Sequence, residues 1–442
     1  MRVLRRRVGE QLSEQKQRYA RAGTPLATMA DEKQLAQTLI AEAVTDHAAT
    51  QLAQHAIVIE ADVQQQLRRA VFAGMFQAGG LQRFLDDDTV ENVNIIGADR
   101  VFLKFADGRK EHGAPAAPDD EALVDMVRRM AEHQGLTSRP WDPTNPFLRL
   151  RLDDGSRLAA IGWVCARPTI SIRRNRYPRI RLDDLVGNRT CSRQVADFLA
   201  AAVRARLTIA VAGDQAVGKT TLLRALIREI PAEERIFTVE ASLELDVEAL
   251  GVHDDVVALE ARSAYGDQLG EVTLTDLVRE TLIQDASRVI VGECRGPEII
   301  ALLNATLGGS GGSMTTVHAK TPRGVFNRIA NFAAQAEERL SAETAHMLAA
   351  EALELVVFLR VVRDSDGTRR RVISDVLQVD GYDRIVQAST VFGWDPVTGQ
   401  AEATEAQPSM LDQLIDAGYR PDYPDYPYRD VAMPSRNGWG ER

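Results

Sequence analysis

The chain has 442 residues, of which 45% are hydrophobic and 26% charged, a composition typical of a globular protein with two or three domains. Its net charge of −10 argues against a dedicated nucleic-acid binder, and its three widely spaced cysteines suit neither a disulfide framework nor a metal site. Such cysteine usage fits the cytoplasm, and no stretch approaches the ~18–20 apolar residues of a membrane span.

The N-terminal part of the sequence predicts two structurally different regions. Residues 1–78 are polar, with apolar residues at spacings of three and four, which predicts a helical extension. Residues 79–185 carry short β-rich runs punctuated by Asp-Gly turns, with one amphipathic helix over 119–135. We therefore expect an α+β module there.

The C-terminal part predicts an α/β domain and a tail. Between residues 186 and 395, near-continuous apolar strands alternate with helices, as in a predominantly parallel sheet covered on both faces. A late β-hairpin with an Asp-Gly turn is expected over 353–380. Residues 396–442 are rich in proline, tyrosine and acids, which predicts disorder.

One motif carries specific chemistry. "GDQAVGKTT" matches the phosphate-loop pattern G-x-x-x-x-G-K-[ST], and it lies between an apolar strand and a helix, as this motif requires. Successive backbone amides at a helix N-terminus cradle phosphate oxygens, so the alternative of an ordinary turn is disfavoured. We expect Lys219 to reach the β- and γ-phosphates of ATP and Thr220 to bind Mg²⁺. The nucleotide-binding residues are expected to be Gly213, Asp214, Gln215, Ala216, Val217, Gly218, Lys219, Thr220 and Thr221.

Acidic residues follow two other predicted strands. Glu293 ends the apolar strand "RVIVGE", and ligands in open parallel sheets bind beyond such ends. We therefore expect Glu293 to hold metal or metal-bound water. Glu240 ends another strand and Glu244 comes one helical turn later, so both are candidates to polarise the attacking water. The plainer interpretation of all three is solvated surface acids.

Taken in order, these motifs resemble the type II/IV secretion ATPases, and most closely the CpaF/TadA branch that powers Tad/Flp pilus assembly. The resemblance spans roughly residues 75–395 and includes "RLDDGSR", "ISIRR", "GEVTLTDLVRETL" and "LVVFLR". It implies that the 79–185 module is PAS-like and that the P-loop core is RecA-like. It also implies a homo-oligomeric ring, usually hexameric, with ATP at the subunit boundaries. It also implies an inner-membrane platform protein as the partner.

The resemblance further implies roles for residues outside the phosphate loop. Arg173, with Arg174 beside it, matches an arginine that meets the nucleotide phosphates. In "GGSGGSMTTVHAK" (308–320), Thr316 and His318 match a sensor of the γ-phosphate or water, and the glycines would let that segment move. The alternative for this segment is a flexible linker. Three further arginines match family positions without an assigned role: Arg262, Arg279 and Arg295.

The chain also departs from the family pattern. Ala241 stands where an aspartate is expected, Ser310 where a histidine is usual, and residues 283–287 read "IQDAS". Our first hypothesis is an ATP-hydrolysing motor for pilus assembly or secretion. The departures keep open a nucleotide-binding regulator or assembly subunit with little turnover. A third hypothesis is a conjugative motor for DNA transfer, which the acidic balance disfavours for direct DNA contact.

Overall fold

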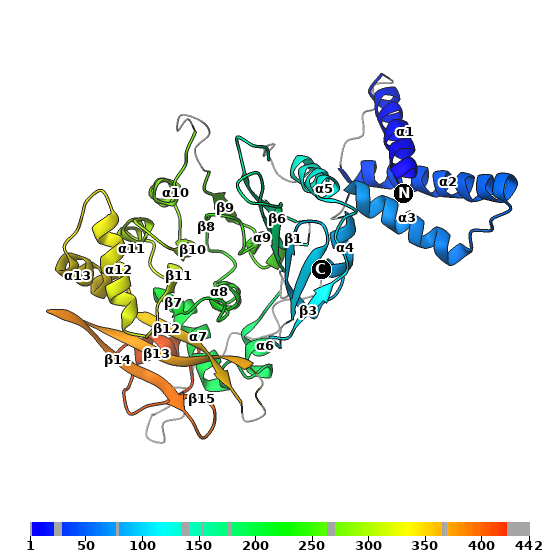
Figure 1. The fold of residues 1–442 in the computed structure, drawn as a ribbon. Coiled ribbons are helices and arrows are strands. Elements are labelled where there is room, and N and C mark those ends of the chain that lie inside the picture. The colour runs from blue at the N-terminus through cyan, green and yellow to red at the C-terminus, as the bar shows by residue number, and fades with distance from the viewer. Residues whose placement is uncertain are drawn as a thin grey trace. The chain divides into compact units, whose positions relative to one another are not determined.

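The computed structural model describes residues 2–21, 29–76, 79–105, 107–133, 141–152, 154–174, 179–262, 270–364, 367 and 369–421 (Figure 1). The chain forms two compact units that divide between Arg176 and Tyr177, earlier than the domain boundary at 185/186 that the sequence predicts. Within the described residues, no helix combines the length and apolar character that crossing a membrane requires.

The first unit begins with helices and continues into an antiparallel sheet. Apolar side chains spaced along the first two helices, among them Leu4, Val8, Ile40 and Val44, form a small core. The described strands of the sheet lie in the order β3-β2-β1-β6-β5-β4, and α5 contributes Leu123 and Val127 to its core. The elements are α1 (Arg2–Arg21), α2 (Met29–His55), α3 (Ala61–Phe76), η1 (Gly79–Leu81), α4 (Gln82–Leu85), β1 (Val90–Ile96), β2 (Arg100–Phe105), β3 (Lys110–Gly113), α5 (Asp120–His133), β4 (Phe147–Arg151), β5 (Arg157–Ile161) and β6 (Thr169–Arg173).

The second unit is built on a mixed sheet whose described strands lie in the order β15-β14-β13-β12-β7-β11-β10-β8-β9. From β12 to β9 every neighbouring pair is parallel, and from β12 to β15 every pair is antiparallel. The strands are β7 (Ile209–Gly213), β8 (Ile236–Glu240), β9 (Val256–Glu260), β10 (Arg288–Cys294), β11 (Met314–His318), β12 (Leu355–Arg363), β13 (Arg369–Asp383), β14 (Ile385–Asp395) and β15 (Gln400–Ala403).

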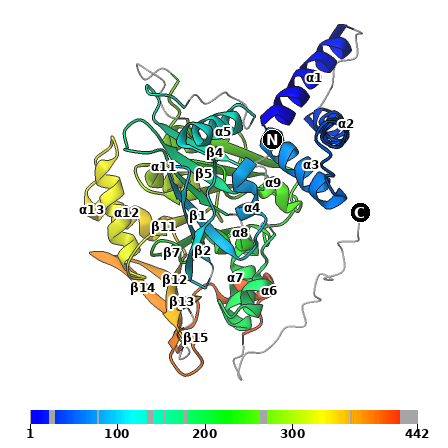
Figure 2. The same cartoon turned by 45° about the vertical axis from the view of Figure 1, so that its right-hand side comes forward.

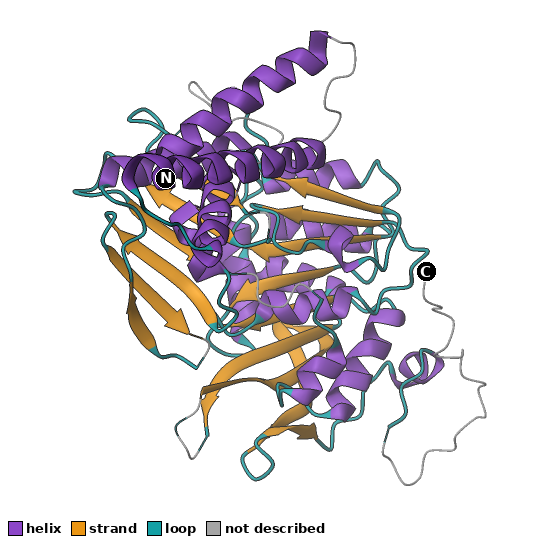
Figure 3. Ribbon diagram, turned by 90° about the vertical axis from the view of Figure 1, so that its right-hand side faces the viewer, coloured by secondary structure: helices purple, strands orange, loops and turns teal. Residues whose placement is uncertain are grey.

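Helices cover both faces of this sheet, which is why its central strands are apolar throughout (Figures 1 and 3). One face buries residues of α6 (Leu182–Gly187), α7 (Arg193–Arg204) and α8 (Lys219–Ile227). The other buries residues of α10 (Leu274–Thr281), α11 (Glu298–Leu307), α12 (Gly324–Gln335) and α13 (Ala342–Ala352). Figure 2 shows α7 and α8 on the opposite side of β7 and β12 from α12 and α13. The predicted α/β fold with a mostly parallel sheet is confirmed.

The segment after residue 395 corrects the prediction of a disordered tail. Residues 400–403 form β15, and α14 (Leu411–Asp416) packs beside α7. Tyr419 is only 2% exposed, and its ring meets Phe198 edge-on, with 5.4 Å between ring centroids. The apolar side chains spaced along this segment outweigh its proline and acidic content because they cover the core face of α7. Residues 422–442 lie outside the described residues.

The parallel strands place their carboxyl ends along one edge of the sheet. Gly213 of β7 pairs with His318 of β11 in register, and Val239 of β8 pairs with Val291 of β10. The residues that follow those positions therefore meet at one edge, where a doubly wound sheet binds its ligands. This edge holds the phosphate-loop motif and both predicted acidic strand ends.

Candidate active site

The phosphate-loop motif has the predicted strand–loop–helix form. β7 is buried along its whole length, residues 214–218 turn, and α8 begins at Lys219. Gly213 has φ +147°, and a Cβ there would lie 2.4 Å from the Leu359 carbonyl oxygen, so only glycine fits. Gly218 (φ +98°) and Ala216 (φ +61°) also take left-handed conformations, which alternate the direction of successive peptide groups.

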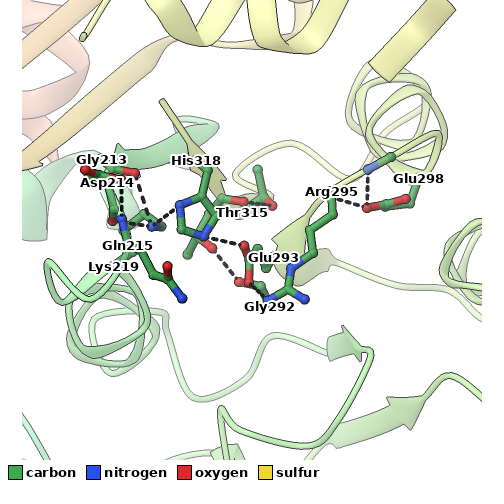
Figure 4. Close-up of polar contacts among 12 residues, drawn as sticks. Gly213, Asp214, Gln215, Lys219, Gly292, Glu293, Arg295, Glu298, Thr315 and His318 are labelled. Atoms are coloured by element: carbon green, nitrogen blue, oxygen red, sulfur yellow. Dashed lines mark hydrogen bonds and ion pairs between the residues drawn. The ribbon is translucent and has the colours of Figure 1, made fainter. Parts of the chain in front are cut away.

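Lys219 lies inside this loop and is bound by its own backbone. Its Nζ donates to the carbonyl oxygens of Gly213 (3.2 Å) and Asp214 (2.8 Å), and it lies 3.1 Å from Nδ1 of His318 (Figure 4). An ammonium group can only donate, so Nδ1 accepts and the proton of a neutral ring belongs on Nε2. Burial and the charge of Lys219 lower the pKa of His318, which favours this neutral ring.

Glu293 joins His318 to an arginine. His318 Nε2 lies 2.8 Å from Glu293 Oε1, and Arg295 donates to Oε2 at 2.6 Å (Figure 4). Burial alone would raise the pKa of Glu293, but the hydrogen bond and charge of Arg295, with His318 and Lys219, hold that pKa below its usual range. The Glu293 carboxylate is therefore ionised at neutral pH. His318 lies between it and Lys219 of the phosphate loop and contacts both.

Glu240 is buried rather than presented to solvent. It is 3% exposed, and its Oε2 accepts the backbone N–H groups of Glu244 (2.7 Å) and Leu245 (2.9 Å). Its carboxylate also packs against Gly292, where a Cβ would lie 3.1 Å from Glu240 Cγ. Glu240 thus ties the 241–245 turn to the strand that carries Glu293.

Glu244 stands on that turn and is half-buried. The hydrogen bond from Arg295 to Glu293 raises the pKa of Arg295, and the negative charges of Glu244 and Glu298 add to the effect. Glu244 is therefore close enough to act electrostatically on the arginine that binds Glu293. Of the two acids in the 240–244 stretch, Glu244 is the one left more accessible to a water molecule.

The glycine-rich segment and His318 lie at opposite ends of β11, which the sequence did not reveal. Arg288 donates to the Gly312 carbonyl oxygen, and Ser313 links the Ser310 carbonyl to the Val289 amide at the amino end of the sheet. The glycine run connects α11 to β11 within one unit, so the linker interpretation is wrong. Its glycines also do not flank His318. Thr316 is buried and donates to the Gly292 carbonyl oxygen at 2.8 Å, which braces β10 against β11.

The predicted arginines are distributed over both units. Arg173 is exposed at the end of β6 in the first unit, so its contact with nucleotide stays a prediction. Arg174 is tied within that unit to the Asp87 carbonyl and Asp88. Arg262 donates to the Gly270 carbonyl, and the exposed Arg279 pairs with Glu338.

Two contributors to the site were not predicted from the sequence. Glu298 Oε1 accepts the backbone N–H groups of Arg295 and Gly296, and so fixes the turn after β10. Arg371 donates from Nε to the Ala216 carbonyl oxygen at 3.0 Å. The first could have been suspected from an acid in the first turn of a helix. The second had no local signal, because it depends on how β13 folds back along the sheet.

The donor set can be tested against Mg²⁺. Within the described part of the chain, no group of three or more His, Cys, Asp or Glu side chains could hold a metal ion. In triphosphate sites Mg²⁺ takes most of its oxygens from phosphate and water, with one or two protein ligands. Thr220 in the first turn of α8 and the ionised Glu293 are oxygen donors of that kind at the same sheet edge.

The chain is similar in sequence to known proteins. A profile of the family described as Type II/IV secretion system protein matches residues 143–405. A putative conjugal transfer protein of Mycobacterium tuberculosis is 33% identical over 343 residues, covering 76% of this chain and 93% of the relative. Protein VirB11 of Agrobacterium fabrum is 27% identical over 315 residues, covering 64% and 88%. The crystal structure of the VirB11 ATPase from the Brucella suis type IV secretion system in complex with sulphate has 26% sequence identity and a TM-score of 0.37, covering 71% of this chain and 96% of that one.

Proposed function

The chain belongs to the type II/IV secretion system protein family, and we propose that it is an ATP-hydrolysing motor of the Tad/Flp pilus-assembly kind. The observation that carries the proposal is the line of contacts from the phosphate loop through Lys219 and His318 to Glu293. A loop of backbone amides, a lysine inside it and an ionised acid two strands away in the sheet are the parts that phosphoryl transfer to water requires.

The proposed roles follow from where the side chains lie. The amides of residues 213–221 and Lys219 hold the phosphates of ATP, and the hydroxyl of Thr220 and the carboxylate of Glu293 hold Mg²⁺ and its water. The chemistry that a bound Mg²⁺ supplies is neutralisation of phosphate charge. Lys219 must exchange its bonds to the Gly213 and Asp214 carbonyls for phosphate oxygens. His318 would then sense that exchange through Nδ1, because its hydrogen-bond donor would have moved.

For the attacking water we propose a division of labour between the two acids of the 240–244 stretch. Glu244 is the base that orients the water. Glu240 acts through it as a positioning residue, because its carboxylate is buried and holds the Glu244 amide. Arg173 is proposed to stabilise charge on the γ-phosphate, as in the family that the chain resembles.

The assembly proposal extends the same family likeness. We propose a homo-oligomeric ring, hexameric as is usual in the family, that works in the cytoplasm against an inner-membrane platform protein. The alternative of a subunit with little turnover rests partly on Ser310. That residue lies at the amino end of β11, where its hydroxyl donates to the Ala286 carbonyl, away from Lys219. Its departure from the family pattern therefore removes no group from the phosphate site.

The decisive experiment measures ATP turnover of the full chain with and without Mg²⁺, together with its oligomer mass. We expect Mg²⁺-dependent turnover that rises with oligomerisation and is lost in Lys219→Ala. Arg193→Ala, which removes the same charge from an exposed side chain, is the matched control. Tight ATP binding with negligible turnover in the assembled ring and in the presence of its platform protein would favour the regulator, and turnover unchanged by Lys219→Ala would refute the proposal.

The names of relatives favour one second candidate, a motor for conjugative DNA transfer, since a putative conjugal transfer protein is 33% identical. Such a motor need not touch its cargo. Deleting the gene from a cell that both builds pili and transfers a plasmid separates the two. Loss of pili with normal plasmid transfer supports the pilus motor, and the reverse supports the conjugative one.

A further inference from the structure

The C-terminal hairpin of β12 and β13 runs directly beside the phosphate loop. Leu359 of β12 pairs in register with Gly213, the last residue before the loop, and leaves no room for a Cβ there. β13 pairs with β12 so that Arg371 lies opposite Val361, one residue pair farther toward the hairpin end than Val372 and Arg360. The strand register therefore carries the Arg371 side chain past the end of β7.

Arg371 contacts the middle of the loop. Its Nε donates to the Ala216 carbonyl oxygen at 3.0 Å, and its Cδ would lie 3.6 Å from a Cβ placed on Gly218. Ala216 is the loop's non-glycine residue with positive φ, at +61°, a conformation that costs free energy unless its surroundings hold it. A guanidinium bond to its carbonyl is such a restraint.

Contacts of the neighbouring residue hold the part of β13 that carries Arg371 in place. Its neighbour Arg370 donates to both carboxylate oxygens of Asp364, at 3.0 and 3.2 Å, and to the carbonyl oxygens of Arg189 and Gly399. This network ties the end of the hairpin to the segment before α7 and to the β14–β15 turn. Arg371 therefore projects from a braced strand rather than from a free loop end.

A planar trans peptide points its carbonyl and its N–H in opposite directions. Holding the Ala216 oxygen on the Arg371 side thus directs the Val217 N–H to the other side of the loop. On the function proposed above, that side is where the phosphates bind. We propose that Arg371 is a positioning residue of the phosphate loop, which sets the direction of the 216–217 peptide and so presents the Val217 amide to a phosphate oxygen.

The test uses the full chain with three variants of Arg371 and one control. Arg371→Met keeps length without a donor, Arg371→Gln keeps a neutral donor, and Arg371→Lys keeps charge with a different reach. The control is Arg369→Met, an exposed arginine on the same strand. The measurements are calorimetric Kd values for Mg²⁺–ATP and for inorganic tripolyphosphate, and hydrogen exchange at the Val217 amide without nucleotide.

For Arg371→Met we expect binding of both probes to weaken about three- to tenfold, the scale of one hydrogen bond, with faster exchange at Val217. Arg371→Gln should bind both probes more tightly than Arg371→Lys does. Arg369→Met should have the Kd values and the Val217 exchange rate of the wild type. Unchanged Val217 exchange and unchanged Kd in Arg371→Met would overturn the inference alone. If Arg371→Lys restored the affinity for both probes and Arg371→Gln did not, the inference would also be overturned. The charge at residue 371, and not the direction of the 216–217 peptide, would then determine the affinity. If the wild type binds neither probe, the proposed function fails, and this inference with it.

Discussion

Glu240 and Gly292 lie side by side on adjacent parallel strands, with the glutamate carboxylate occupying the space that a side chain at 292 would need. A Cβ on Gly292 would lie 3.1 Å from Cγ and 3.3 Å from Oε2 of Glu240. The same Oε2 accepts the amides of Glu244 and Leu245. Gly292 therefore permits the buried acid that shapes the turn beside the site.

Gly292→Ala is expected to displace Glu240 and with it the 241–245 turn. Overpacking of this kind costs about 1–3 kcal/mol of stability, and kcat should fall while ATP still binds, because the phosphate loop is untouched. Gly187→Ala is the control, since no atom lies within 4 Å of a Cβ there. Urea unfolding and steady-state kinetics check both. Wild-type kcat in Gly292→Ala would contradict the role of the turn.

Substitutions of Glu240 and Glu244 should have different effects on kcat and on its pH dependence. Glu244→Gln is expected to lower kcat about 10²–10³-fold and to abolish the acidic limb of its pH dependence, because this change removes the base proposed to orient the water. Glu240→Gln keeps an oxygen acceptor and weakens one charged hydrogen bond, so we expect a loss of about fivefold, or about 1 kcal/mol. Its acidic limb should remain. If the two variants exchanged these behaviours, Glu240 would be the base.

His318 should couple stability to pH. Burial and Lys219 lower its pKa in the folded chain, so the unfolded chain binds the proton more readily. The free energy of unfolding should therefore be unaffected by His318 above the ordinary histidine pKa of about 6.5, and it should decline as the pH falls below that value. His253 is also buried, and its pKa is lowered too.

We expect the free energy of unfolding to fall between pH 7.5 and 5.5 in the wild type, and to fall less in His318→Gln. His253→Gln measured in the same way isolates the contribution of the second histidine. Identical slopes for wild type and His318→Gln, from urea unfolding at each pH, would show that the imidazole does not titrate against Lys219.

A buried ion pair at the opposite edge of the sheet should matter for stability alone. Arg288 is fully buried and binds both carboxylate oxygens of Glu234, at 2.8 and 2.6 Å. Removing one partner leaves a buried charge without its counter-charge, so Glu234→Gln should cost about 3–5 kcal/mol.

The exposed pair of Arg279 and Glu338 gives the contrast to this buried pair. Glu338→Gln should cost no more than about 1 kcal/mol. The Kd for ATP should stay unchanged in both variants at temperatures where they are folded. Equal destabilisation by the two changes would mean that the burial of Arg288 adds nothing.

Local patterns were enough to predict the features whose signal lies within a few neighbouring residues. The phosphate loop needs only glycines, a lysine and the strand and helix beside them, and an apolar strand ending in an acid predicts that Glu293 lies at the sheet's ligand edge. Alternating apolar strands and helices likewise predicted the parallel sheet, because each such strand must be covered on both faces.

Only the tertiary structure decided which of these residues meet and what surrounds them. The sequence does not distinguish the roles of Glu240 and Glu244. In the structure, Glu240 is buried against Gly292 and binds the backbone of the 241–245 turn. The glycine run and His318 are close in the chain, and the length of β11 separates them. Arg371 reaches Ala216 from 155 positions away, and Tyr419 folds onto Phe198. Each of these depends on the register between distant strands and helices, which is fixed by packing across the whole core and leaves no mark in any short stretch of sequence.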